Sequence, residues 1–169
     1  MSMKRVLVLG CSGAGKSTLA RQISGITGLP IIHLDQHYWR PGWREPDRGA
    51  WECEVAALIH RPEWVMDGNF GGTLPARAAA ADTAIFLDFP AWRCLIRVLR
   101  RVIASFGRTR ADMAPGCPER LDFAFLIYVC RYRRRDRQRH LAAIGQLDGT
   151  LVTLCRPAEV AAFVAALEA

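Results

Sequence analysis

The stretch that decides the fold is Gly10-Cys11-Ser12-Gly13-Ala14-Gly15-Lys16-Ser17, which matches G-x-x-x-x-G-K-[ST] at every fixed position. Its glycines allow the backbone to curl tightly, so that successive N–H groups point inward at an anion. A strand pattern over residues 4–9 precedes the stretch and a helical pattern follows it, which adds the positive end of a helix dipole. We therefore predict a phosphate-binding loop (P-loop) that holds a nucleoside triphosphate, either ATP or GTP.

Two side chains of this loop have distinct expected roles. Lys16 should reach the β- and γ-phosphates, and Ser17 should offer its hydroxyl to Mg²⁺. The alternative is a glycine-rich turn that binds nothing, but the lysine, the serine and both flanking elements favour a nucleotide site. The full set of expected nucleotide contacts in the loop is Gly10, Ser12, Gly13, Ala14, Gly15, Lys16, Ser17 and Thr18.

Strand and helix patterns alternate along the rest of the chain. Strands are expected at residues 4–9, 31–34, 64–66, 84–87 and 151–154, and helices at 16–24, 47–60, 76–81, 92–106, 119–144 and 158–167. This alternation predicts a three-layer α/β/α fold with a mainly parallel five-stranded sheet. We expect one domain over residues 1–169, with a small helical insert at about 107–120, where glycines and prolines interrupt the helical spacing.

Composition narrows the class of protein and its partners. No apolar run approaches the roughly 18 residues of a membrane span, and the N-terminus lacks a signal-peptide core, so we expect a cytoplasmic protein. The six cysteines are scattered, as is typical of buried thiols rather than a zinc site. The net charge is +7, and 13 of the 23 basic residues, with only four acidic ones, lie between Arg93 and Arg139. This segment predicts an anionic partner, either nucleotide phosphates or a nucleic-acid backbone.

Beyond the P-loop, the chain resembles the adenylate-kinase-like branch of the P-loop kinases. The resemblance rests on Asp67-Gly68-Asn69-Phe70, on two arginine-bearing helices and on the Gly/Pro-containing insert between them. Residues 34–43, 67–74 and 108–120 resemble more closely the bacterial proteins called topology-modulation proteins. The likeness covers roughly residues 5 to 140. It implies a kinase-like architecture with a lid, whereas the name of the second family does not establish an activity.

The resemblance carries arginine roles onto this sequence. In adenylate kinases, the helix before the lid has two nucleotide-facing arginines four residues apart, a spacing that Arg97 and Arg101 share. After the lid, an Arg-x-Asp is followed by a further arginine, and Arg120, Asp122 and Arg131 reproduce this order. The four arginines are therefore expected to clamp phosphates, because planar guanidinium groups suit the three oxygens of a transferring phosphoryl.

Two lid arginines, Arg108 and Arg110, are expected to reach the acceptor only when the lid closes and excludes water. At the acceptor side the chain departs from the adenylate kinases. In that family, the Asp-Gly motif is followed by one further residue and then by Pro-Arg. This chain has Phe70-Gly71 in place of the Pro-Arg pair. The resemblance therefore does not imply that the acceptor is AMP.

Two aspartates follow expected strands and should lie beside the P-loop, since ligands bind at the carboxyl ends of parallel strands. Asp67 is expected to hold the hydration shell of Mg²⁺, or else to cap the turn that Asp-Gly favours. Asp35 is expected to act as the base that takes the acceptor's proton, or to bind the acceptor.

The remaining acceptor candidates cluster around Pro41-Gly42. This aromatic and basic group can stack on an acceptor base, or else pack the cap that follows the second strand. Arg77 is expected to contact an acceptor phosphate or to lie on a solvated helix. The expected acceptor site comprises Asp35, Tyr38, Trp39, Arg40, Trp43, Asn69, Arg77, Arg108 and Arg110.

Two functions fit these patterns. The first is a kinase that moves the γ-phosphoryl of Mg-ATP to a nucleoside, a nucleotide or a small hydroxylated metabolite. Its expected catalytic residues are Lys16, Asp35, Arg97, Arg101, Arg120 and Arg131. The second is a nucleotide-regulated nucleic-acid-binding protein without kinase activity, which the basic segment permits. No helix-turn-helix or zinc-finger pattern supports the second function, so we favour the kinase.

Overall fold

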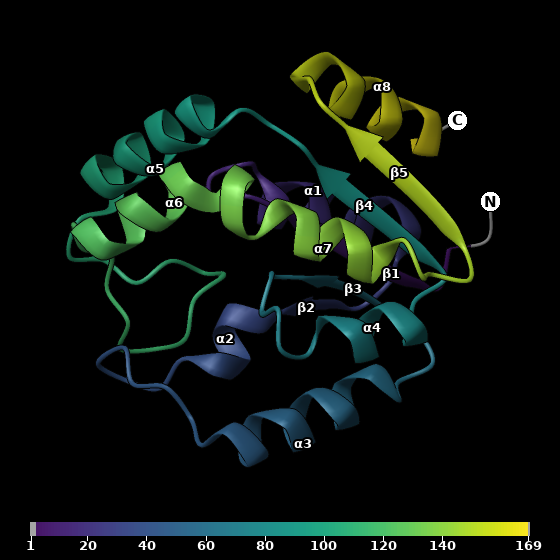
Figure 1. Cartoon of the computed structure of the whole chain (residues 1–169), viewed down its shortest axis with the longest axis horizontal. Helices are drawn as coiled ribbons and strands as arrows, with labels where there is room; N and C mark the ends of the chain where they lie inside the picture. Colours follow the sequence, from purple (N-terminus) through teal and green to yellow (C-terminus); the bar gives the residue numbers. More distant parts are fainter. Residues whose placement is uncertain (1–2, 169) are drawn as a thin grey trace.

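A parallel sheet forms the centre of the computed structural model, which describes residues 3–168 (Figure 1). Its strands are β1 (Arg5–Gly10), β2 (Ile31–His33), β3 (Trp64–Asp67), β4 (Thr83–Leu87) and β5 (Thr150–Leu154). Their order is β2-β3-β1-β4-β5, and every neighbouring pair is parallel. The predicted five-stranded sheet is confirmed, and all five carboxyl ends lie along one edge.

Helices cover both faces of the sheet. Val6 and Val8 pack into one core, and Leu7 and Leu9 pack into the other, because successive strand side chains point to opposite faces. The first core is covered by α1 (Lys16–Thr27) and α8 (Pro157–Glu168). The second is covered by α3 (Arg48–Ile59), α4 (Leu74–Ala80) and α7 (Arg137–Ile144). The predicted three-layer α/β/α arrangement is confirmed.

Two further helices, α5 (Ala91–Ser105) and α6 (Phe123–Arg135), pack side by side at the carboxyl edge of the sheet (Figure 1). The single long helix predicted for residues 119–144 is wrong, because the chain breaks at Asp136 between α6 and α7. Arg137 binds both carboxylate oxygens of Asp88 at 2.9 and 2.7 Å, which pins the start of α7 to the end of β4. No helix within residues 3–168 has the length and apolarity needed to cross a membrane.

Replacing Arg137 with glutamine should lower the free energy of unfolding by about 1–2 kcal/mol at pH 7, because a two-pronged charged hydrogen bond is lost. The hydrogen bond from Arg137 holds the pKa of Asp88 below its usual range. The ion pair therefore stabilises the fold fully when the pH is above the ordinary carboxylate pKa. This stabilisation is lost as the pH falls through the lowered pKa of Asp88. Urea unfolding of both proteins at several pH values should show the difference shrinking in acid. Arg134→Gln, on the exposed side of α6, should change stability little at any pH.

The segment between α5 and α6 departs from the helical lid that was predicted. Residues 107–120 form turns and contain no helix. Three of these residues, Met113, Ala114 and Cys117, pack against Trp39 and Trp43. The Gly42 N–H donates to the Gly116 carbonyl at 2.8 Å, and the Trp43 indole N–H donates to the Pro118 carbonyl at 3.0 Å. The insert (residues 106–122) is therefore docked on the segment after α2 (Leu34–Tyr38), a short helix at the place of the cap considered after the second strand.

Candidate active site

The P-loop connects β1 directly to α1. Gly10, Gly13 and Gly15 have φ values of 138°, 85° and 101°, a region that other residues rarely adopt. A Cβ atom at Gly10 or Gly13 would also collide with a backbone carbonyl oxygen, of Leu87 or Cys94. At Gly15 the nearest atom is the tip of the Arg97 side chain, 3.5 Å away, so the space in front of α1 is open. The loop thus has the shape of an anion cradle at a helix N-terminus.

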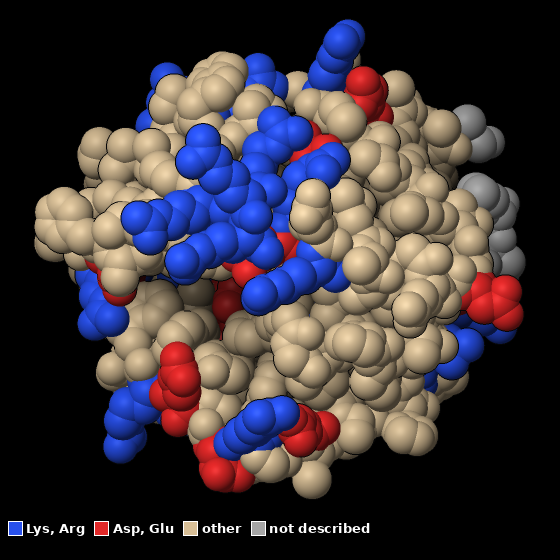
Figure 2. Space-filling view, viewed as in Figure 1, with Lys and Arg blue, Asp and Glu red and all other residues tan. Residues whose placement is uncertain are grey.

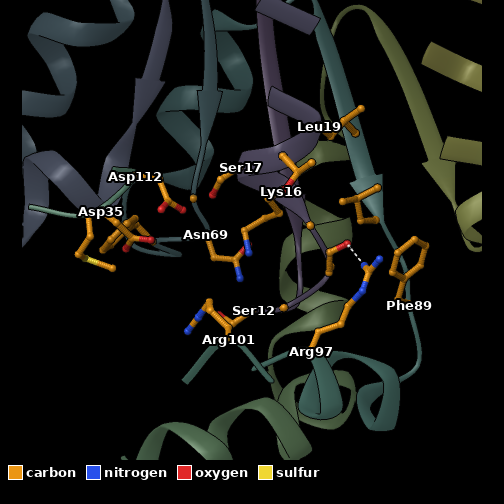
Figure 3. A pocket seen from close by; sticks show the side chains of 18 of the residues that line it. Ser12, Lys16, Ser17, Leu19, Asp35, Asn69, Phe89, Arg97, Arg101 and Asp112 are labelled. Carbon is orange, nitrogen blue, oxygen red and sulfur yellow. Dashed lines mark hydrogen bonds between the residues drawn. The ribbon is translucent and has the colours of Figure 1, made fainter. Parts of the chain in front are cut away.

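A large pocket opens at the carboxyl edge of the sheet, with the P-loop in its middle. Its volume is about 2020 Å³, above the 300–1,000 Å³ or so of a site for one small ligand, so it has room for two molecules. Its two ends differ chemically (Figure 3). The lining of the apolar end includes Phe89, Arg97, Pro157, Val160 and Val164. The lining of the carboxylate end includes Asp35, Trp39, Trp43, Arg110 and Asp112.

Most of the loop residues predicted to contact nucleotide line this pocket, namely Ser12 through Thr18. Gly10 does not, and its N–H donates to the Asn69 side-chain oxygen at 3.3 Å. The prediction of a nucleotide contact is therefore wrong for Gly10, which shapes the loop instead. Asn69 lines the pocket and also donates to the Tyr128 hydroxyl at 3.2 Å, so it joins the P-loop to β3 and α6.

The residues predicted to bind Mg²⁺ are adjacent. The Ser17 hydroxyl donates to Asp67 Oδ2 at 2.6 Å, and the other carboxylate oxygen of Asp67 lies 2.5 Å from Nδ1 of buried His33. Hydroxyl and carboxylate oxygens are ligands that Mg²⁺ prefers. Among residues 3–168, no group of three His, Cys, Asp or Glu side chains is arranged to hold a metal. These residues fit a Mg²⁺ ion whose other ligands are phosphate oxygens and water, the usual arrangement for this metal.

Asp35 lies in α2, immediately after β2, and lines the carboxylate end. Figure 3 shows its side chain beside that of Asp112, on the side of Ser17 away from Phe89. Burial raises the pKa of Asp35, although the charge of Lys16 opposes the rise. A carboxylate with a raised pKa holds a proton more firmly, which makes it a stronger base for chemistry near neutral pH.

A chain of alternating charges crosses the insert from α5 to the carboxylate end. Arg101 Nη2 lies 3.0 Å from Glu119 Oε1, and Arg110 Nε lies 2.8 Å from Glu119 Oε2. The Arg110 Nε–H is poorly aimed at this oxygen, so the contact is mainly electrostatic. Arg110 Nη1 then donates to both oxygens of Asp112, at 3.0 and 2.9 Å. We call Arg101, Glu119, Arg110 and Asp112 the ion-pair chain.

Asp112 is ionised within this chain. Burial pushes its pKa upward, but Arg110, the Ser17 hydroxyl and His33 together hold the pKa below its ordinary value. Burial lowers the pKa of Arg101, and nearby Arg110 acts in the same direction, against the pull of Glu119.

The arginine pair predicted to face the nucleotide lines the pocket. Arg97 donates to the Ala14 carbonyl at 3.0 Å, and its guanidinium carbon lies 5.8 Å from the centre of the Phe89 ring. Arg101 lies on the same face of α5, one turn further along the helix, and lines the pocket as well. Figure 3 shows the Arg97 side chain at the apolar end beside Phe89, whereas Arg101 lies closer to Ser12 of the P-loop.

Arg77 does not belong to the site, so its predicted contact with an acceptor phosphate is wrong. Its side chain is fully buried. Its guanidinium donates to the backbone carbonyls of Gly68, Asn69 and Phe70, and to the Thr73 hydroxyl. Arg77 therefore holds the loop that follows β3, and its donors are occupied by that loop.

Four other predicted site residues also lie outside the pocket. Tyr38 packs against Trp51 and Phe70, and Arg40 binds Glu54 Oε2 at 3.1 Å. The others are Arg108, in the insert, and Arg131, on α6, and both are exposed. None of the four lines the pocket. Tyr38 and Arg40 are used in packing and ion pairing, so their predicted contacts with the acceptor are wrong. The contact of Arg108 requires a closed lid, and this contact and the phosphate-binding role of Arg131 stay predictions.

The last predicted arginine, Arg120, does line the pocket. It lies at the rim, with its side chain 55% exposed and its guanidinium carbon 5.4 Å from the centre of the Trp43 ring.

Sequence reasoning missed two functional candidates, Asp112 and Glu119, and the contact of His33 with Asp67. Asp112 and Glu119 stand in the stretch 108–120, where only the arginines received roles. Two carboxylates among the arginines of a strongly basic segment were the available signal for the ion-pair chain. His33 is the last residue of a short strand, and no sequence pattern marked it as the partner of Asp67.

No protein-family model matches the chain, and no curated protein matches its sequence. Solved structures do match its fold. A shikimate kinase from Bacteroides thetaiotaomicron matches with 14% identity over 99% of this chain and 97% of its own, with a TM-score of 0.58. A shikimate kinase from Acinetobacter baumannii in complex with shikimate matches with 14% identity over 98% and 91%, with a TM-score of 0.57.

A deoxyadenosine kinase from M. mycoides with bound dCTP also matches, with 10% identity over 95% of this chain and 96% of its own, and a TM-score of 0.51. At such low identity the likeness shows the fold alone. This chain shares its three-layer α/β/α fold with these kinases.

Proposed function

We propose that the chain is a kinase that moves the γ-phosphoryl group of a nucleoside triphosphate, ATP or GTP, to a hydroxyl of a small acceptor. The observation that carries the proposal is the position of the P-loop in the middle of a pocket with room for two molecules and two different ends. The apolar end suits the base of the nucleotide, and the carboxylate end suits the acceptor. The likeness of the fold to structures of kinases supports the same reading.

On the nucleotide side, the P-loop N–H groups and Lys16 bind the phosphates. Phe89 and Arg97 offer an aromatic face and a planar cation to the base. Ser17 and Asp67 would hold Mg²⁺, with His33 fixing the Asp67 carboxylate. When bound there, Mg²⁺ supplies positive charge that offsets the negative charge on the phosphates.

On the acceptor side, Asp35 takes the proton of the acceptor hydroxyl as that oxygen bonds to the γ-phosphorus. The bond from the γ-phosphorus to the bridging oxygen breaks, and the nucleoside diphosphate leaves with that electron pair. Arg101 stabilises the charge on the transferring group. The positions of Arg97 and Arg101 support the adenylate-kinase-like type, whereas Arg131 does not line the pocket. Arg77 does not line it either, so Arg77 offers no contact to an acceptor phosphate.

Replacing Lys16 with alanine should lower acceptor-dependent turnover by about 10²–10³, the usual effect of removing one group that stabilises transition-state charge. The measurement is the release of ADP or GDP, and the phosphorylation of each acceptor, with Mg-ATP or Mg-GTP across a panel of nucleosides, nucleotides and hydroxylated metabolites. The chain has only one other lysine, Lys4, which is exposed and 4.0 Å from Glu63. Lys4→Ala should retain full activity.

Tight binding of ATP or GTP without stimulation by any acceptor would contradict the kinase. That result would favour the second candidate, a nucleotide-regulated nucleic-acid-binding protein. Exposed arginines of α6 and α7 favour it, since they form the basic surface in Figure 2. Nucleic-acid binding through this surface would weaken steeply with salt concentration. The resemblance to topology-modulation proteins rests on sequence stretches alone and adds no activity to this candidate.

A further inference from the structure

The carboxylate end presents two carboxylates from different parts of the chain. Asp35 comes from α2 and Asp112 from the insert, and their side chains lie beside each other (Figure 3). Within residues 3–168, no side chain or backbone group donates a hydrogen bond to the Asp35 carboxylate. Asp112 accepts two hydrogen bonds from one nitrogen of Arg110 and lies close to the Ser17 hydroxyl, which leaves at least one of its four lone-pair positions free. The carboxylate end of the pocket can therefore accept hydrogen bonds, so it is complementary to a ligand that donates them.

The arginines around this end are already committed to other groups. Arg110 binds Asp112 and Glu119, and Arg77 binds backbone carbonyls. Arg40 binds Glu54 and the His37 carbonyl. A phosphate or carboxylate next to the reacting hydroxyl would face Asp35 and Asp112 without a free cation, which is unfavourable. An anionic group would need one of the exposed arginines that line the pocket, such as Arg120 or Arg139, in place of a cation beside the two carboxylates.

Two tryptophans supply an apolar wall at the same end. Trp39 and Trp43 meet edge to face with ring centres 5.3 Å apart, and both line the pocket. Trp43 has φ of 62°, a strained value for a bulky residue, and strain of this kind concentrates at functional sites. Its indole N–H is bound to Pro118, so what remains for a ligand is apolar ring surface. Such surface suits the C–H face of a sugar ring.

We infer that the acceptor is a sugar, free or as the ribose of a nucleoside, with vicinal hydroxyls and no anionic group close to the reacting one. This inference rests on the proposed kinase function. Asp35 takes the proton of the reacting hydroxyl, as described above. Asp112 accepts a hydrogen bond from the neighbouring hydroxyl and thereby positions the sugar. The positive charge of Arg110 beside Asp112 makes it a poor Mg²⁺ ligand but leaves it a good hydrogen-bond acceptor.

The direct test compares matched neutral and anionic acceptors with the wild-type protein and Mg-ATP or Mg-GTP. The pairs are glucose with gluconate, ribose with ribose 5-phosphate, and nucleosides with their 5′-monophosphates. We expect phosphoryl transfer to a free sugar or to a nucleoside. The acceptor with the higher kcat/KM shows whether the natural sugar ring is free or belongs to a nucleoside. Its kcat/KM should exceed that of the anionic partner by at least about tenfold, as expected for one unpaired charge in the pocket.

Two results separate the inference from the function on which it rests. If a hydroxy acid or a nucleoside monophosphate is the better member of its pair, the inference is wrong and the kinase stands. If no acceptor of any kind is phosphorylated, the proposed function itself is wrong.

Replacing Asp112 with asparagine tests the positioning role. The KM for the sugar should rise about tenfold or more, as expected for loss of a charge-assisted hydrogen bond, while kcat falls by less than about threefold. Affinity for Mg-ATP should change much less than the KM for the sugar, and the melting temperature should fall by roughly 2–8 °C, because the ion pair with Arg110 is weakened. The control is Glu63→Gln, which removes an exposed carboxylate and should change neither KM nor kcat. A fall in kcat at unchanged KM would overturn the role of Asp112, and the acceptor pairs remain decisive if the variant does not fold.

Discussion

Replacing Arg77 with methionine should lower the free energy of unfolding by about 3–5 kcal/mol, a loss typical of breaking a buried charged network. The side chain is fully buried, and it bonds three backbone carbonyls and the Thr73 hydroxyl. Methionine fills part of the space but leaves these oxygens without donors. Burial lowers the pKa of Arg77 to about 9, so the guanidinium is still charged near neutral pH.

Urea unfolding monitored by tryptophan fluorescence would measure this loss. Arg61→Met is a matched control, because Arg61 is exposed before β3 and should tolerate the change within about 0.5 kcal/mol. Arg77→Lys should recover only part of the stability, since an ammonium cannot reproduce the planar fork that spans several carbonyls. Full stability in Arg77→Met combined with lost acceptor binding would instead restore Arg77 to the active site.

Replacing Asp35 with asparagine should lower acceptor-dependent turnover by about 10²–10⁴, the range found for removal of a general base. Asparagine keeps nearly the same shape, so affinity for the nucleotide should change little. Turnover and nucleotide affinity, measured on the same preparation, separate these effects. A variant that keeps more than half of the wild-type rate would show that Asp35 is not the base.

The pH profile gives a second readout for Asp35. Burial raises the pKa of Asp35 above its ordinary value of 3.8, and a base works only when it is ionised. The rate should therefore fall as the pH drops through the raised pKa, at a higher pH than for an ordinary carboxylate. This fall in rate at low pH is the acidic limb of the profile, and it should be absent from the residual activity of Asp35→Asn. Asp148→Asn, in the turn before β5 and absent from the pocket lining, should keep the limb.

The sheet and its layers could be predicted because their signals are local. Val6 to Leu9 is apolar on both faces, as a central parallel strand must be, and the glycines of the P-loop are required by φ values that the motif already implies. Likewise, Asp35 and Asp67 follow strands whose carboxyl ends must meet at one edge. These features could be predicted because each depends on residues that are close together in the sequence.

Where prediction failed, the cause is a contact between distant residues. The break between α6 and α7 is fixed by Arg137 and Asp88, which are 49 residues apart, and the helical periodicity runs through it. Arg77 carries the same charge as the solvated arginines elsewhere in the chain, and only the carbonyls that point at it decide its burial. The insert lacks a helix because its apolar residues are used against Trp39 and Trp43 rather than along one helix face.

The ion-pair chain has a thermodynamic consequence. Arg101 faces the P-loop and Asp112 faces the carboxylate end, with only Glu119 and Arg110 between them. If a bound phosphate attracts Arg101 away from Glu119, Glu119 keeps only Arg110 as a partner. Arg110 then interacts more strongly with Glu119 and less strongly with Asp112. The affinities of the two ends are thereby coupled, and linkage requires the factor to be the same in both directions. Whichever ligand enters first therefore changes the affinity of the other, and the size of this cooperativity is set by a glutamate that need touch neither ligand.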